Sequence, residues 1–364
     1  FCAAHNASWF IKKQKHLPAF FLQWHTIQAY YCICLNPFSC PDDSAIYSNP
    51  ATVCIFICVS PGTHTGTAQV FVDSNCVWTC CPCIFIHCFI IYFFPVLRNR
   101  QFQGRLVFFT SEDGEQWKCT NSVSKENFGW MWECPDYFEV DGSQVVIFSP
   151  MGFLKDGKAD DAQAVCMQVK FDEETCQMEL PDEYQFMDYG MDLYAPQSTL
   201  DAEGRRILTA WLRMPEPVNG KWQGMMSIPR VVEVKGGRIY FRVHPNIQAA
   251  YTREISVPSE ADESGYRVRF SLKDGEKVNI GGYVIYRSGN KIHTDRSNLY
   301  KVFPDHRVEF ETPELKDGFE IETYVNPNQI SVFVNNGEAV ITNTVYNLGE
   351  NIETDVELNI DTIE

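Results

Sequence analysis

The chain has 364 residues, a length that suits two or three domains of ordinary size. Its 47 acidic side chains outnumber 30 Lys and Arg, so the net charge is -17. Because such a surface repels polyphosphates and anionic lipids, we expect neither nucleic acids nor membranes as partners. Aromatic residues make up 14% of the chain. Sugar rings stack on aromatic faces, although aromatic side chains fill cores equally well.

The first 97 residues differ from the rest of the chain in composition. They contain 11 of the 15 cysteines but only three acidic and three basic side chains, with no Glu or Arg. The spacers in the cluster Cys80, Cys81, Cys83 and Cys88 are apolar, which disfavours a disulfide scaffold. A zinc site is disfavoured because no pair of C-x-x-C units has ribbon spacing. A third interpretation, a reading frame shifted upstream of Arg98, stays open beside these two.

The stretch from residue 76 to residue 96 has 21 residues without a charge, which is long enough to span a bilayer. Pro82, His87 and Pro95 argue against that alternative, as does the β-rich sequence that resumes soon afterwards. No signal peptide is recognisable, so we expect a cytoplasmic protein.

From Arg98 onward, short apolar or alternating runs are separated by turn dipeptides, which is typical of an all-β protein. Two hairpins are predicted, one joining residues 105–110 to 116–118 and one joining residues 138–140 to 144–149 through Asp141-Gly142. Further strands are predicted at residues 164–171, 177–180, 207–212 and 231–243, the last range divided by Gly236-Gly237.

Hairpins that repeat at this spacing fit the blades of a β-propeller, and they also fit a sandwich. The acidic and aromatic stretches between them suit the lining of a central pocket. After about Tyr251, polar alternating strands at residues 282–287, 319–324 and 330–334 predict a β-sandwich. We therefore expect a propeller domain over residues 1–246, with residues 1–97 anomalous. A sandwich domain over residues 247–364 should follow, through a linker at residues 244–252.

One carboxyl group stands among aromatic side chains in the string Phe128-Gly-Trp-Met-Trp-Glu-Cys-Pro-Asp-Tyr-Phe138. If Trp130 and Trp132 desolvate Glu133, its pKa rises toward the range in which it can protonate a leaving group near neutral pH. That property is required of the acid in a glycosidase. The structural alternative is a strand-edge carboxylate near an aromatic cluster.

This string resembles the W-E-C-P-D motif of glycoside hydrolase family 32, whose Glu is the acid/base catalyst. The similarity continues in order through residues 145–152, Asp188-Tyr-Gly-Met-Asp-Leu-Tyr-Ala-Pro-Gln197, residues 205–211 and Ser227-Ile-Pro-Arg230. Residues 294–297 and 330–338 are similar to the family's C-terminal sandwich. The resemblance covers about residues 98–364. It implies a five-bladed β-propeller, incomplete or distorted in its N-terminal part, followed by a β-sandwich.

The resemblance also implies retaining hydrolysis of terminal β-D-fructofuranosyl bonds, which needs a carboxylate nucleophile besides Glu133. The family's nucleophile lies in N-D-P-N-G and a second Asp lies in R-D-P, but this sequence has neither motif. Upstream of Arg98 only Asp42, Asp43 and Asp73 are available. Asp73 is the better candidate, because the surrounding Phe-Val-Asp-Ser could be a degraded F-R-D-P, whereas the other two suit a turn.

Five further residues are carried over as substrate contacts: Trp132, Cys134, Asp136, Asp192 and Tyr194. The two aspartates would accept hydrogen bonds from sugar hydroxyls and the tyrosine would pack near the ring. A turn acceptor, a loop carboxylate and a core tyrosine are the structural alternatives. Trp211 and Trp222 are interpreted as blade core. No metal constellation, phosphate loop or nucleophile elbow is recognisable, so we expect no metal and no cofactor.

The sequence therefore predicts an O-glycosyl hydrolase acting on sucrose, sucrose 6-phosphate or a fructan, with a small sugar as its partner and Glu133 as acid/base. The alternative is a catalytically inactive carbohydrate-binding remnant, since half of the carboxylate pair is missing if residues 1–97 are the true product. The sequence does not predict the oligomeric state.

Overall fold

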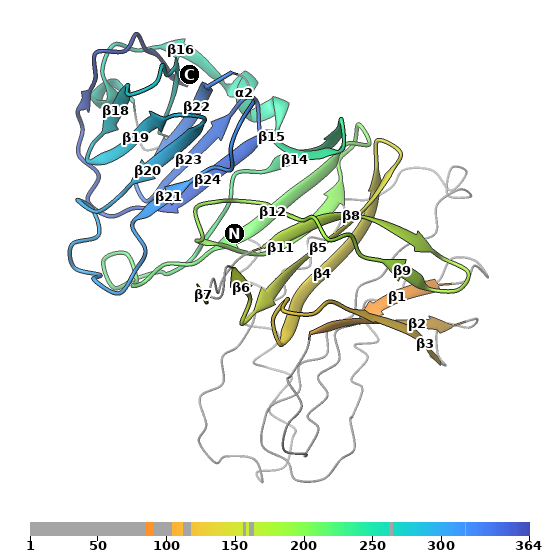
Figure 1. Ribbon diagram of the computed structural model, residues 1–364. Helices are drawn as coiled ribbons and strands as arrows, with labels where there is room; N and C mark the ends of the chain where they lie inside the picture. The colour runs from red at the N-terminus through yellow and green to blue at the C-terminus, as the bar shows by residue number, and fades with distance from the viewer. Residues whose placement is uncertain are drawn as a thin grey trace, which may run out of the picture. The chain divides into compact units, whose positions relative to one another are not determined.

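The computed structural model describes residues 85–89, 104–111, 118–155, 158–159, 164–261, 265–316 and 318–364. These residues form antiparallel β-sheets, so the prediction of an all-β protein is confirmed (Figure 1). Within them, no helix is long and apolar enough to cross a membrane. The predictions on residues 1–84, including Asp73 as nucleophile and most of the cysteine cluster, lie outside the described part.

The first sheet consists of β1 (Phe85–Phe89), β2 (Arg105–Ser111) and β3 (Lys118–Ser124), in that order. The strand predicted over residues 105–110 is confirmed. The return strand was predicted over residues 116–118, and in the structure it begins at Lys118. β1 pairs along its whole length with β2. The alternative of a membrane-spanning stretch over residues 76–96 is therefore wrong for its described part, because those residues form a sheet strand.

The second sheet is built around a long hairpin that contains Glu133. Its strands are β4 (Met131–Val140), β5 (Ser143–Met151), β8 (Val165–Asp172), β9 (Gln177–Glu179) and β10 (Gln185–Phe186). They follow the order β10-β8-β5-β4, with β9 on β8, while β6 (Leu154–Lys155) and β7 (Lys158–Ala159) pair with each other. Asp141 and Gly142 both have positive φ, 50° and 71°, as a two-residue hairpin turn requires. The predicted hairpin is confirmed, and Glu133 lies on its first strand.

The third sheet consists of β11 (Leu193–Leu200), β12 (Arg206–Leu212), β13 (Met225–Met226), β14 (Arg230–Lys235) and β15 (Arg238–Val243). Its order is β11-β12-β14-β15, with β13 on β12, and β11 contacts β4 and β5 (Figure 1). The helix α2 (Pro245–Ala250) then occupies the predicted linker. In the described part, these three sheets and the β6–β7 pair precede α2. Closure of five such blades into a propeller stays a prediction.

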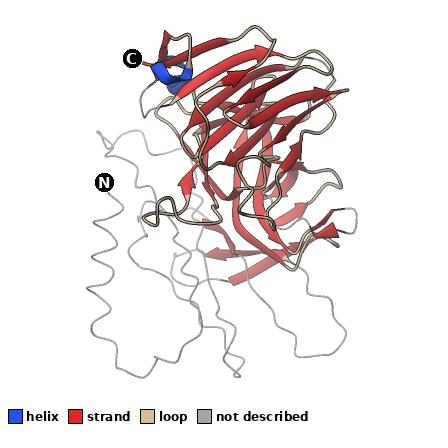
Figure 2. Ribbon diagram, turned by 90° about the vertical axis from the view of Figure 1, so that its left-hand side faces the viewer, coloured by secondary structure: helices blue, strands red, loops and turns tan. Residues whose placement is uncertain are grey.

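Two further antiparallel sheets follow and form two layers (Figure 2). The first has the order β16 (Tyr251–Glu254), β26 (Asn359–Ile363), β17 (Tyr266–Ser271), β22 (Glu320–Asn326), β23 (Gln329–Val334) and β24 (Ala339–Thr344). The second has the order β21 (Glu309–Glu311), β20 (Lys291–Asp295), β19 (Tyr283–Ser288), β18 (Lys277–Ile280) and β25 (Ile352–Glu353). A 3-10 turn, η2, spans Pro258–Glu260. Buried side chains such as Val268, Ile285 and Ile330 from both sheets share one core, which is the arrangement of a sandwich.

A separate apolar core joins the third sheet to the sandwich. Leu208 on β12 and Phe241 on β15 share it with Tyr324, Phe333 and Val340 on β22, β23 and β24. All five side chains are almost fully buried, and burial of each large apolar side chain contributes about 1.5–3 kcal/mol. The sheet that carries Tyr194 is therefore packed directly on the sandwich.

Candidate functional site

Trp132 and Glu133 are successive residues of β4, so their side chains point to opposite faces of the strand. Trp132 is fully buried: its ring stacks on Phe148 with centroids 4.4 Å apart, and its indole N–H donates to the carbonyl oxygen of Phe128 at 2.7 Å. Glu133 is only partly buried. The prediction that Trp132 contacts substrate is therefore wrong, because its indole belongs to the core on the other face.

Both strands of the site have a β-bulge directly after the residue of interest. The register of β4 against β5 shifts after Glu133, and the register of β11 against β12 shifts after Tyr194. The next residue in each case, Cys134 and Ala195, has a left-handed φ of 50° and is followed by proline. This conformation is unfavourable for a residue with a side chain, and more so before proline. Such bulges redirect side chains and gather next to active sites.

The two bulged strands bring Tyr194 and Glu133 together. The hydroxyl of Tyr194 donates a hydrogen bond of 2.5 Å to Oε2 of Glu133. Burial raises the pKa of Glu133, the direction that the sequence predicts, while the Tyr194 hydrogen bond acts to lower it. Burial and then the adjacent carboxyl group raise the pKa of Tyr194, so the phenol stays protonated and donates. The guanidinium of Arg213 lies 4.9 Å from the centre of the Tyr194 ring and restrains it from the other side.

Asp136 connects β4 to β11. Its Oδ2 accepts hydrogen bonds from the backbone N–H of Ser198 at 2.8 Å and from the Ser198 hydroxyl at 2.6 Å. Asp136 is only 9% exposed, and burial raises its pKa against these two hydrogen bonds. The carboxyl group of Asp136 therefore fastens the two strands to each other, and its contact with sugar hydroxyls stays a prediction. Gln197 adds a hydrogen bond of 3.3 Å to the carbonyl oxygen of Cys134, and a substrate contact of the Cys134 thiol stays a prediction.

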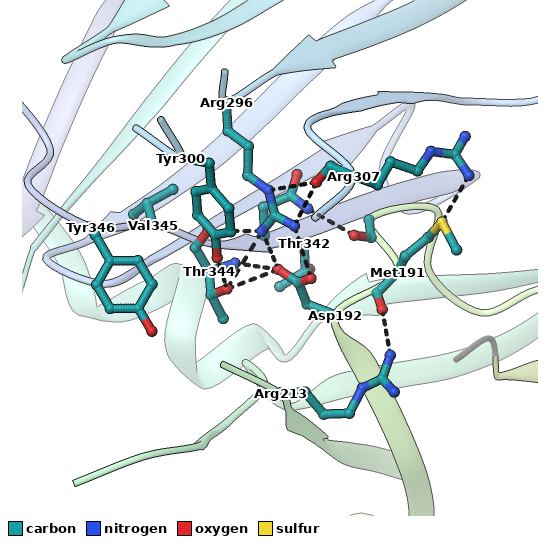
Figure 3. Close-up of polar contacts among 12 residues, drawn as sticks. Met191, Asp192, Arg213, Arg296, Tyr300, Arg307, Thr342, Thr344, Val345 and Tyr346 are labelled. Carbon is teal, nitrogen blue, oxygen red and sulfur yellow. Dashed lines mark hydrogen bonds and ion pairs between the residues drawn. The ribbon is translucent and has the colours of Figure 1, made fainter. Parts of the chain in front are cut away.

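The carboxylate of Asp192 is bonded to the sandwich (Figure 3). Arg296 donates to Oδ2 at 2.5 Å and to Oδ1 at 3.1 Å, and Thr344 donates its backbone N–H at 2.8 Å and its hydroxyl at 2.9 Å to Oδ2. Arg296 directly follows β20 and Thr344 ends β24. These hydrogen bonds show that Asp192 fastens β11 to the sandwich, and its contact with sugar hydroxyls stays a prediction.

Two tryptophans that the sequence analysis assigned to blade core are instead exposed. Trp211 is 39% exposed and Trp222 is 44% exposed, so that interpretation is wrong. Trp211 lies directly opposite Tyr194 in the β11–β12 pair, and directly opposed residues of an antiparallel pair project from the same face. An open aromatic surface therefore lies next to the tyrosine that holds Glu133.

Two residues that shape the site were not anticipated from the sequence. Ser198 directly follows the last residue of the recognised Asp188–Gln197 motif, and this adjacency is the sequence signal by which it could have been found. Arg296 is separated from Asp192 by 104 positions, and no local pattern pairs them. In the described residues no three His, Cys, Asp or Glu side chains gather as a metal site would require.

The partly buried carboxyl group of Glu133, with a raised pKa and a hydrogen bond from a tyrosine on a neighbouring bulged strand, has the properties of a general acid. The family model described as "Glycosyl hydrolases family 32 N-terminal domain" matches residues 89–245. The match begins within β1, upstream of the composition break at Arg98. Sucrose-6-phosphate hydrolase of Vibrio alginolyticus is 27% identical over 270 residues, which cover 67% of this chain and 54% of that protein.

Two solved structures share the fold. Sucrose-6-phosphate hydrolase from Lactobacillus gasseri gives a TM-score of 0.62 at 17% identity, covering 77% of this chain and 66% of that chain. A mutant of a Bombyx mori GH32 beta-fructofuranosidase, in complex with sucrose, gives 0.61 at 19% identity, covering 80% and 69%. The chain spans about half the length of the curated relatives it matches. The motif around Glu133 therefore lies within a segment, residues 89–245, that matches the family model of the glycoside hydrolase family 32 N-terminal domain.

Proposed function

We propose that this protein is a β-fructosidase that cleaves terminal β-D-fructofuranosyl bonds with retention of configuration, using Glu133 as general acid/base. The observation that carries the proposal is the Glu133 carboxyl group, which is partly buried, has a raised pKa and is held at 2.5 Å by Tyr194. The family match around this residue supports the same reaction class.

The two opposing influences on Glu133 suit a group that must serve first as acid and then as base. In the first step a carboxylate nucleophile bonds to the anomeric carbon while Glu133 transfers its proton to the departing glycosidic oxygen. In the second step the ionised Glu133 takes a proton from water, whose oxygen bonds to the same carbon and releases the nucleophile. Burial favours the protonated form before the first step, and the Tyr194 hydrogen bond stabilises the carboxylate that results.

The nucleophile must stand roughly 5–5.5 Å from Glu133. Asp136, Asp188 and Asp192, the motif aspartates in the described residues, are all hydrogen-bonded to protein donors. We therefore assign the nucleophile to Asp73 within this proposal. The proposal also keeps a five-bladed propeller domain over residues 1–246 and a sandwich domain over residues 247–364.

Sucrose and sucrose 6-phosphate are the substrates that we propose to assay first, since the similar proteins carry these names. Trp211, exposed beside Tyr194, offers an aromatic face on which a sugar ring can stack. A small sugar with a terminal fructosyl unit is therefore the proposed ligand.

The test is hydrolysis of both sugars by the unaltered chain and by Glu133→Gln, which should lower kcat by about 10²–10⁴-fold because it removes the transferable proton. Asp73→Asn should abolish formation of the covalent intermediate. Glu139→Gln is the matched control, because it makes the same substitution at an exposed position of β4. Absence of hydrolysis by the unaltered chain, or an unchanged kcat in Glu133→Gln, would contradict the proposal.

A further inference from the structure

The segment from Asp188 to Asp192 runs along the outer edge of the sandwich strand β24. The backbone N–H of Tyr189 donates to the carbonyl oxygen of Val340 at 2.8 Å, and the backbone N–H of Thr342 donates to Oδ1 of Asp188 at 2.8 Å. β24 is the last strand of its sheet, so this segment satisfies backbone groups that an edge strand leaves unpaired. The chain that leads into β11 is thus held by the sandwich.

Asp192 is the last fixed point of this segment before the site. Its partner Arg296 is 2% exposed and is itself held from three sides (Figure 3). The guanidinium donates to the carbonyl oxygens of Thr344 and Arg307, each at 3.0 Å. It also lies 3.8 Å from the centre of the Tyr300 ring. A two-pronged contact from a side chain with so little freedom sets both the position and the orientation of the carboxylate.

Only Leu193 separates Asp192 from Tyr194. Leu193 is buried in the core that the third sheet shares with the sandwich. The backbone N–H of Arg213 donates to the carbonyl oxygen of Asp192 at 2.9 Å, and its guanidinium covers the Tyr194 ring. If Asp192 moves, the tightly packed residues between it and Tyr194 cannot compensate, so the tyrosine hydroxyl that is bonded to Glu133 moves as well.

We infer that Arg296, a sandwich residue outside the segment that matches the family model, is a positioning residue for Glu133, acting through Asp192 and Tyr194. The inference rests on the proposed function, in which Glu133 is the acid/base. A contribution to stability alone is the alternative. The two differ in whether the ionisation of Glu133 responds when Arg296 is changed.

The groups that face Glu133 limit what can cause such a response. Tyr194 on β11 is the described side chain that contacts its carboxyl group, and Arg213 on β12 lies behind the tyrosine ring. The residue opposite on β5 is Ser149, which does not titrate, and Asp136, further along β4, is bonded to β11. Among the described groups, the route by which substitution of Arg296 reaches the pKa of Glu133 is therefore through Asp192 and the strand that carries Tyr194.

The decisive experiment follows the ionisation of Glu133 by 13C NMR of the side-chain carboxyl carbon in glutamate-labelled protein, with Glu133→Gln to assign the signal. Arg296→Met should raise the pKa of Glu133 in the same direction as Tyr194→Phe, and the double variant should show no further rise. In sucrose hydrolysis, Arg296→Met should lower kcat about 10- to 100-fold with a smaller change in KM. Arg296→Lys, which keeps one donor on Asp192, should restore part of both effects.

Arg267→Met is the matched control, because Arg267 is a buried arginine of the sandwich whose ion pair, with Asp361 at 2.8 Å, lies within that sheet. It should lower stability and leave the Glu133 titration unchanged. If Arg296→Met does not fold, Asp192→Asn removes the same ion pair with a smaller change in volume. The positioning role is overturned if the folded Arg296 or Asp192 variant titrates like the unaltered chain. If the titration moves but the unaltered chain hydrolyses neither sugar, the proposed function fails and the positioning role stands.

Discussion

Replacing Tyr194 by phenylalanine removes a single oxygen from the site and leaves an aromatic ring of nearly the same size. Tyr194 is only 6% exposed and its ring lies against the guanidinium of Arg213, so the strand should keep its position. The substitution deletes the 2.5 Å hydrogen bond to Oε2 of Glu133 and changes no formal charge. Its effect on catalysis therefore reports on that hydrogen bond.

The magnitude follows from the nature of the bond. A hydrogen bond to a charged group contributes about 1.5–3 kcal/mol, and here it favours the carboxylate form of Glu133. Since about 1.4 kcal/mol corresponds to one pH unit, its loss should move the titration of Glu133 upward by about one to two pH units. The protonated form is the active one in the first step, so activity is lost as pH rises through this pKa. The alkaline limb of the profile should therefore move to higher pH.

The assay is the pH dependence of kcat/KM for sucrose in Tyr194→Phe and in the unaltered chain. At low pH the variant should also have a lower plateau, because a weaker acid protonates the departing oxygen less readily. An alkaline limb that stays in place, or that moves to lower pH, would refute the role given to Tyr194.

Three further predictions concern stability and binding. Arg230→Met should lower the free energy of unfolding by about 3–5 kcal/mol in urea titrations, because the buried Asp188 carboxylate loses the cation that is bonded to it at 2.6 Å. A loss below about 1 kcal/mol would contradict this prediction. Trp132→Ala should cost about 3–5 kcal/mol by the same measurement, because it empties a fully buried site. Trp211→Ala should change stability by under about 1 kcal/mol, since the residue is 39% exposed, but should raise KM for sucrose; an unchanged KM would remove it from the site.

The hairpins and the acid residue were predictable because their signals are local. Alternating apolar residues and an Asp-Gly turn fix the β4–β5 pair within one short segment, and the string around Glu133 carries its aromatic neighbours with it. The prediction of a raised pKa for Glu133 is confirmed in direction. Its expected source is only partly right, because strand alternation turns Trp132 away and the site is closed by Tyr194 instead.

The contacts that the sequence did not predict are those decided by distant partners. From the sequence, Asp192 is interpreted as a loop carboxylate, whereas in the structure it pairs with Arg296, which lies 104 positions later. Asp136 reads as a sugar acceptor until the β4 and β11 bulges place Ser198 against it. Trp211 reads as core because its strand is apolar, yet its face of the sheet is left open. Each outcome depends on which elements pack together, and no residue spacing within one segment contains that information.

The claim on which the account depends is that Glu133 delivers the proton to the fructosyl bridge oxygen. The pH dependence of kcat/KM for sucrose in Glu133→Gln tests it most directly, because the amide cannot donate or titrate. We predict a strongly reduced activity without the alkaline descent that the unaltered chain shows as Glu133 ionises. A variant that keeps the same alkaline descent at comparable activity would show that another group supplies the proton.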